Sequence, residues 1–208
     1  MQLNSVTAEP SLSLIVIGDA GQGKTTLTAA LTHYSAKRYA TTRAEYKDLC
    51  EGKEEISGNA RYKVARVEYE TNNRLYRQLD FPDHTDCVKY LESGAAKVDG
   101  AILVCSQTDD SMLVVKTQLK LCRAAGVEHL VVFLNKKVET MDPELLELME
   151  MEIRDLLSAE GFNGDDAPFH AGSALTANEN ELDCLAGRLM CSIEKEIPLP
   201  ARGPLGES

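Results

Sequence analysis

The chain is poor in aromatic and basic side chains. It has no tryptophan, only 5% of its 208 residues are aromatic, and 22 lysines and arginines stand against 33 aspartates and glutamates. The resulting net charge of -11 argues against sequence-independent binding to DNA or RNA, because such binding needs basic groups that displace counterions from the phosphates. A basic protein partner remains compatible with this charge.

Long apolar runs and paired cysteines are also missing. No run approaches the length needed to span a bilayer, and the polar N-terminus has neither the basic start nor the apolar core of a signal peptide. We therefore expect no membrane insertion and infer a cytoplasmic location. The six cysteines include no C-x-x-C pair, so buried reduced thiols are favoured over disulfides or a metal site.

The length fits one domain that can bury a sizeable core. We expect an N-terminal lead over residues 1–11, a folded domain over residues 12–197 and a disordered tail over residues 198–208, which contain several prolines and glycines. The composition requires no second domain.

Apolar runs typical of buried strands alternate with helical patterns. Such runs occur at residues 12–17, 101–105 and 130–134, and apolar residues recur at helical spacing in residues 26–37 and 112–125. Strands of this kind are buried on both faces, and their alternation with helices is typical of βαβ units. The sequence therefore predicts an α/β fold around a parallel sheet.

Between the first helix and the second half of the chain lies a long polar segment. Residues 39–59 have little apolar periodicity and are too many for a plain connection, which is typical of a functional or mobile loop. Directly after it, residues 62–69 alternate between polar and apolar side chains, and residues 75–79 form a second short run across a turn. Together these two runs predict a β-hairpin.

The clearest helix signal begins at Asp142, an N-cap residue followed by Pro143 at the first helical position. Its apolar stripe, which ends near residue 159, consists of Leu145, Met149, Ile153 and Leu157. After this helix, residues 168–172 predict a last short strand and residues 181–193 a last helix.

One segment carries a specific chemical signal. Residues 18–25 read GDAGQGKT and match the phosphate-binding pattern G-x-x-x-x-G-K-[ST], with the strand before it and the helix after it that this motif requires. In such a loop backbone N–H groups surround a β-phosphate, Lys24 reaches its oxygens, and the Thr25 hydroxyl is a ligand for Mg²⁺. The residues that we expect to bind nucleotide phosphates are Asp19, Ala20, Gly21, Gln22, Gly23, Lys24, Thr25 and Thr26.

Three further motifs occur at strand ends: DFPDH from Asp80, NKKV from Asn135 and SAL from Ser173. Their order and spacing, together with the phosphate loop, resemble the GTP-binding (G) domain of translational GTPases of the elongation factor Tu type. The resemblance covers about residues 12–197. It is carried by GKTTLTAALT from Gly23, RVEYET from Arg66, SGAAKVDGAILV from Ser93, VVFLNK from Val131, ELLELMEMEIRDLL from Glu144 and GSAL from Gly172.

This resemblance implies a fold and a set of ligands. The fold is the P-loop NTPase G-domain fold, with six mostly parallel strands, one of them antiparallel, and helices on both faces of the sheet. The ligands are GDP or GTP and Mg²⁺, and the activity is GTP hydrolysis.

The resemblance also implies roles for single residues. Asp80 would hold Mg²⁺ through water, together with Thr25, and His84 would position the water that attacks the γ-phosphate. Asn135 and Lys136 would bracket the guanine ring. The segment whose backbone contacts the guanine carbonyl would consist of Ser173, Ala174 and Leu175.

Several positions that carry the family's chemistry differ in this chain. Residues 19–22 replace a polar, histidine-containing segment, and Arg61 or Ala60 stands where a threonine coordinates Mg²⁺. Asp83 replaces the glycine of D-x-x-G, and a carboxylate about 5 Å from a γ-phosphate costs roughly 3 kcal/mol at an effective dielectric of about 20, or about a hundredfold against GTP. Val138 replaces the aspartate of N-K-x-D and cannot accept hydrogen bonds from guanine.

We therefore expect a nucleotide-binding G domain with impaired hydrolysis, weakened guanine selectivity and a preference for GDP. Two local alternatives remain: Glu139 takes the place of the missing aspartate, or Arg61 pairs with Asp83 and holds the mobile loop closed without a γ-phosphate.

Two alternatives also remain for the whole chain. One is an active GTPase that uses His84, and the other is a pseudo-GTPase that binds elongation factor Ts or another translation component through the helix at residues 142–159 without needing nucleotide. In the family, two β-barrel domains that grip aminoacyl-tRNA come after the G domain, and the sequence ends at Ser208. We therefore do not expect ordinary delivery of aminoacyl-tRNA.

Overall fold

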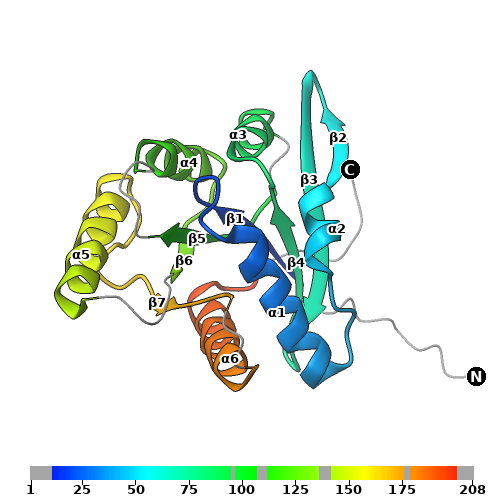
Figure 1. The fold of residues 1–208 in the computed structure, drawn as a ribbon. Coiled ribbons are helices and arrows are strands. Elements are labelled where there is room, and N and C mark those ends of the chain that lie inside the picture. The colour runs from blue at the N-terminus through cyan, green and yellow to red at the C-terminus, as the bar shows by residue number, and fades with distance from the viewer. Residues whose placement is uncertain (1–10, 95–96, 107–111, 136–141, 176–178, 201–208) are drawn as a thin grey trace, which may run out of the picture.

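Seven strands form one sheet in the order β2-β3-β4-β1-β5-β6-β7 (Figure 1). The computed structural model describes residues 11–94, 97–106, 112–135, 142–175 and 179–200. All strands run in the same direction except β3, which is antiparallel to both of its neighbours, β2 and β4. The strands are β1 (Ser11–Ile17), β2 (Lys53–Ser57), β3 (Ala60–Glu70), β4 (Leu75–Asp80), β5 (Gly100–Ser106), β6 (His129–Asn135) and β7 (Phe169–Gly172).

Helices cover both faces of this sheet. Two of them, α1 and α6, pack on one face, and α3, α4 and α5 pack on the other, as Figure 1 shows. The helices of the described residues are α1 (Lys24–Tyr39), α2 (Tyr46–Glu51), α3 (His84–Glu92), α4 (Met112–Ala124), α5 (Pro143–Ala159) and α6 (Glu179–Glu196).

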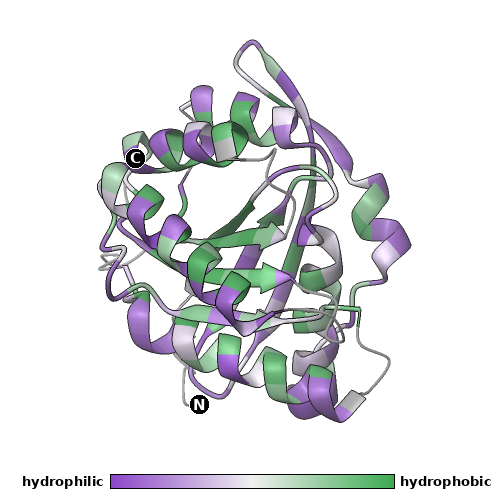
Figure 2. Cartoon of the chain, turned by 60° about the vertical axis from the view of Figure 1, so that its left-hand side comes forward, coloured by the Kyte–Doolittle hydropathy of each residue, from purple (hydrophilic) through white to green (hydrophobic). Residues whose placement is uncertain are grey.

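The central strand β1 illustrates how the two cores are built. Leu14 and Val16 belong to the core under α1 and α6, whereas Ile15 and Ile17 belong to the core under α3, α4 and α5. All four side chains are fully buried, because successive residues of a strand point to opposite faces and both faces are covered. Figure 2 shows the result, with hydrophobic central strands and helices that are hydrophilic on part of their surface.

The predicted α/β fold and the predicted hairpin are confirmed. Strands β3 and β4 pair in antiparallel register with Tyr69 opposite Tyr76. The number of strands differs from the prediction, because the polar segment at residues 39–59 contains α2 and the edge strand β2. The sequence of β2 is KEEIS, and most of its side chains are exposed, so backbone pairing with β3 forms this strand without an apolar pattern.

The helix predicted from Asp142 is also confirmed. Asp142 accepts a hydrogen bond from the backbone N–H of Glu144 at 3.0 Å, and α5 ends at Ala159 as expected. Its inner side is buried at Ile153 and Leu157. Leu145 was expected on the same buried stripe, but it is exposed, and it forms an outer α5 stripe that consists of Leu145, Leu148 and Met151.

All six cysteines are free, as expected. Burial was expected for all of them, and Cys87, Cys105 and Cys122 are buried. The expectation is wrong for Cys50, Cys184 and Cys191, whose thiols are exposed on helices. Within the described residues no helix has both the length and the apolar character that crossing a membrane would require. Most of the expected N-terminal lead and C-terminal tail lies outside the described residues.

Candidate nucleotide-binding site

The sequence motifs meet at the carboxyl edge of the sheet. Gly18 comes directly after β1, Asp80 ends β4, Asn135 ends β6 and Ser173 comes directly after β7. Because these strands are parallel, their carboxyl ends lie along one edge, which is where α/β proteins bind their ligands. The fold therefore gathers residues that are more than 150 positions apart in the chain.

The phosphate loop passes so close to its neighbours that glycine is required at two positions. Gly18 and Gly23 have φ angles of 138° and 94°, which L side chains rarely adopt. A Cβ atom on Gly18 would lie 2.2 Å from the carbonyl oxygen of Val104, and one on Gly23 would lie 2.1 Å from Nδ2 of Asn135. The ends of β5 and β6 thus fix the path of the loop.

Helix α1 begins directly at the end of this loop. Its N-cap is Gly23, and no side chain caps it, so its first N–H groups and the positive end of its dipole are directed toward the loop. Lys24 is 4% exposed, and its Nζ donates to the backbone oxygen of Asp19 at 2.8 Å. Burial lowers the pKa of Lys24, and the nearby carboxylates of Asp80, Asp19 and Asp83 act against that shift.

Asp80 is a buried carboxylate with unused oxygens. It is 0% exposed, and neither oxygen accepts a well-directed hydrogen bond from a described residue. Burial raises the pKa of Asp80 to about 6, against the opposite effects of the Thr25 hydroxyl and Lys24. An orphaned carboxylate beside a hydroxyl fits a Mg²⁺ ion that takes its remaining ligands from phosphate and water oxygens.

Asn135 connects two of the loops instead of leaving its amide free for a ligand. Its Nδ2 donates to the backbone oxygen of Gln22 at 2.9 Å, and its Oδ1 accepts from the backbone N–H of Ala174 at 3.2 Å. In the second loop, the Ser173 hydroxyl accepts from the N–H of Leu175 at 3.2 Å. Lys136, also predicted to contact the base, lies outside the described residues.

Asp83 starts helix α3. Its Oδ1 accepts from the backbone N–H of Thr85 at 2.8 Å, and its φ of −111° is one that any residue adopts. The Thr85 N–H lowers the pKa of Asp83, so this side chain is a carboxylate at neutral pH. The replacement of glycine at this position has therefore created a helix cap beside the phosphate loop.

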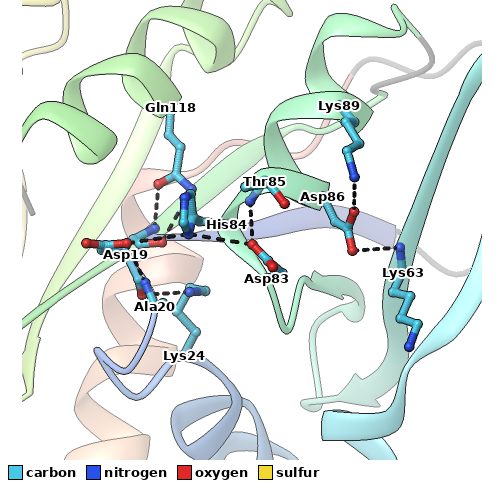
Figure 3. Close-up of polar contacts among 11 residues, drawn as sticks. Asp19, Ala20, Lys24, Lys63, Asp83, His84, Thr85, Asp86, Lys89 and Gln118 are labelled. Carbon is cyan, nitrogen blue, oxygen red and sulfur yellow. Dashed lines mark hydrogen bonds and ion pairs between the residues drawn. The ribbon is translucent and has the colours of Figure 1, made fainter.

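His84 lies between two carboxylates (Figure 3). Its Nδ1 is 3.5 Å from Oδ1 of Asp19 and 3.6 Å from Oδ1 of Asp83, distances that allow ion pairs when the ring is protonated. The same Oδ1 of Asp19 accepts from the N–H of Ala20 at 2.6 Å. Sequence reasoning identified His84 but missed its contact with Asp19, because the turn of the loop decides which way Asp19 faces.

The family comparison agrees with this geometry. The profile of the family described as "Elongation factor Tu GTP binding domain" matches residues 9–198. The chain belongs to this family. Its G-domain fold, predicted from the motifs, is thereby confirmed, and so is its place among GTP-binding proteins of the translational GTPase type.

One hypothesis about this G domain is wrong. Arg61 does not pair with Asp83, because its guanidinium lies 3.0 Å from Glu54 across the β2–β3 hairpin while Asp83 caps α3. Both members of the observed pair are largely exposed, so the pair adds little stability. Val138 and Glu139, which bear on base recognition, lie outside the described residues.

Sequence reasoning also missed Gln118 of α4. Its side chain is fully buried, and its Oε1 accepts from the backbone N–H of Gly18 at 2.8 Å. Its Nε2 donates to the backbone oxygen of the same glycine at 3.3 Å. The only available signal was a glutamine among the apolar positions of a predicted helix.

The cap at Asp83 predicts a dependence of stability on pH. The pKa of Asp83 is lower in the folded protein than its ordinary value of 3.8, so its stabilising contribution is fully present above about pH 4 and is lost as the pH falls through the folded value. At about pH 7, Asp83→Ala should lower the free energy of unfolding by about 1 kcal/mol, and Asp83→Asn, which keeps a capping oxygen, by less.

Urea unfolding between about pH 7 and pH 3 tests this prediction. The difference between wild type and Asp83→Asn should shrink as the pH falls below about 4. A difference that stays constant over this range would show that the charge of Asp83 does not act through the helix.

Proposed function

We propose that this chain is a G domain that binds GDP in preference to GTP, hydrolyses GTP poorly and selects guanine weakly. The observation that supports the proposal most is a phosphate-loop backbone with two acidic side chains close enough for their charges to act on its Lys24. This phosphate cradle consists of the glycine-dependent loop, the uncapped start of α1 and Lys24 itself. The acidic side chains are Asp19 and Asp83.

The cradle supplies the groups that a diphosphate needs. Backbone N–H groups of the loop and of the first turn of α1 donate to the β-phosphate, and Lys24 adds a positive charge. Thr25 and Asp80 would hold Mg²⁺, which would neutralise phosphate charge and remove the cost of the buried Asp80 carboxylate. The nucleotide-binding role of residues 19–26 rests on this arrangement.

A γ-phosphate would be repelled by the carboxylates of Asp19 and Asp83. A carboxylate at about 5 Å from a phosphate charge costs roughly 3 kcal/mol at an effective dielectric of about 20. Asp83 is held by its cap on Thr85, and Asp19 by its bond to Ala20, so moving either carboxylate away breaks a hydrogen bond. His84, our candidate for positioning the attacking water, lies between these carboxylates.

Base selectivity is weakened for a separate reason. Both ends of the Asn135 amide are engaged by Gln22 and Ala174, so Asn135 shapes the base pocket by holding two loops. Val138 offers no acceptor for the hydrogen-bonding edge of guanine. A site with a missing acceptor loses orders of magnitude in discrimination.

The preference for GDP is tested by calorimetric titration with GDP and GTP in saturating Mg²⁺. Wild type should bind GDP about a hundredfold more tightly than GTP, because only GTP brings a charge toward Asp83 and Asp19. Asp83→Asn keeps the cap, removes the charge and should narrow this ratio, as should Asp19→Asn.

Asp86→Asn is the matched control. Asp86 is on the same turn of α3, but its carboxylate binds the Lys63 N–H and the Lys89 ammonium, so the ratio should stay unchanged. Wild-type affinity for GTP equal to or above that for GDP contradicts the proposal. Steady phosphate release that Lys24→Ala abolishes would instead support an active GTPase that uses His84.

Thermal unfolding with GDP, ADP and XDP tests base selectivity. All three should raise the unfolding temperature of the wild-type protein by similar amounts, because each presents the same diphosphate to the cradle. A shift with GDP alone would show that guanine is selected after all, for example through Glu139.

A second candidate function is favoured by the outer α5 stripe. Leu145, Leu148 and Met151 are 43%, 52% and 58% exposed, on a helix whose other side is packed. Exposed apolar side chains grouped in this way mark interaction surfaces. They support a pseudo-GTPase that binds a translation component such as elongation factor Ts through α5.

A pull-down with purified elongation factor Ts and nucleotide-stripped protein tests this candidate. Ts should be retained, and Leu148→Lys should reduce retention at least tenfold by placing a charge in an apolar contact. Glu147→Lys, which changes charge beside the stripe, is the control and should have a smaller effect. Retention that is equal in all three proteins rules out the stripe as the contact.

A further inference from the structure

A buried glutamine holds the first residue of the phosphate loop. Gln118 of α4 is 0% exposed and lies among Val115, Leu119 and Cys122, which fill the core on the same side of the helix. The side-chain amide forms two hydrogen bonds with one residue: Oε1 accepts from the Gly18 N–H at 2.8 Å, and Nε2 donates to the Gly18 oxygen at 3.3 Å. Figure 3 shows Gln118 reaching down from α4 to the loop.

These two bonds fix the conformation of Gly18. The N–H belongs to the peptide plane between Ile17 and Gly18, and the carbonyl belongs to the plane between Gly18 and Asp19. Holding both planes sets φ and ψ of a residue that otherwise populates many conformations. Strand β1 ends at Ile17, and up to that residue neighbouring strands supply its backbone hydrogen bonds. At Gly18 the side chain of Gln118 takes over this role.

The orientation of Gly18 determines the path of the next residues in the loop. The second peptide plane leads into Asp19, whose backbone oxygen accepts from Lys24 and whose carboxylate accepts from Ala20. A rotation at Gly18 would therefore displace the Lys24 ammonium and the donors that face a phosphate. Packing alone does not require glutamine here, because an apolar side chain of similar length would fill the same space. Only an amide can both accept a hydrogen bond from the Gly18 N–H and donate one to the Gly18 oxygen.

We propose that Gln118 is a positioning residue for the phosphate loop, which sets Gly18 and thereby the affinity for nucleotide phosphates. It does not touch the nucleotide. The proposal rests on the proposed function for its consequence in nucleotide binding, but the two bonds between Gln118 and Gly18 lie within the protein and can be tested without nucleotide.

The test uses Gln118→Met, which keeps the length of the side chain and removes both strong hydrogen bonds, and Gln118→Glu, which keeps an acceptor for the Gly18 N–H and places a carboxylate against the Gly18 oxygen. Gln118→Leu replaces the methionine variant if that protein does not fold. Gln118→Met and Gln118→Glu should each raise the dissociation rate of a fluorescent GDP analogue about tenfold or more.

Ser35→Ala is the matched control. Ser35 is also buried, and its hydroxyl donates to the Glu70 oxygen at 2.7 Å, accepts from the Glu70 N–H at 3.1 Å and bonds to the Thr41 hydroxyl at 2.8 Å. The substitution therefore removes at least as many bonds at the other end of α1, away from the phosphate loop. It should lower stability while the GDP dissociation rate stays unchanged.

Amide hydrogen exchange in ligand-free protein provides a second readout. Gln118→Met should speed exchange at residues 18–23 at least tenfold, whereas Ser35→Ala should leave those residues unchanged. If loop exchange is the same in Gln118→Met and wild type, Gln118 does not position the loop and the inference is overturned. If loop exchange rises but wild type binds no GDP, the positioning role stands and the proposed function fails.

Discussion

The structure of the site depends on the close approach of the phosphate-loop backbone to the ends of β5 and β6. Gly18 and Gly23 leave no room for a Cβ against Val104 and Asn135, so this close approach requires glycine at both positions. Two amides then hold it, with Gln118 bound to Gly18 and Asn135 bound to the Gln22 oxygen. The path of the loop is therefore held by contacts within the protein itself.

The phosphate loop is surrounded by negative charge. Lys24 has three carboxylates near it, those of Asp80, Asp19 and Asp83. Backbone N–H groups stabilise two of them, through the bonds from Ala20 to Asp19 and from Thr85 to Asp83. Charge-assisted bonds of this kind are about twice as strong as neutral ones. The negative charge is consequently part of the folded architecture, and an anion that enters must work against it.

The sequence allowed the fold and the location of the candidate site to be predicted because both predictions depend on apolar patterns and strand order. The runs that became β1, β5 and β6 are buried on both faces, so every residue in them is informative. Strand β2 was missed because it forms at an exposed edge through backbone pairing. Asp19 beside His84 and Gln118 beside Gly18 were missed because long-range geometry, and no local pattern, brings each pair together.

The two amides hold the ends of the loop and leave its middle exposed. Ala20 and Gly21 are exposed, between the held residues Gly18 and Gln22. The N–H of Ala20 already donates to the Asp19 carboxylate, so a phosphate oxygen could accept from this N–H only in competition with that carboxylate. A phosphate that binds there exchanges one charged acceptor for another and gains less than it would from a free N–H. In the function proposed above, affinity therefore comes from Lys24, Mg²⁺ and the start of α1, which would all serve a β-phosphate, whereas the carboxylates of Asp19 and Asp83 would oppose a third one.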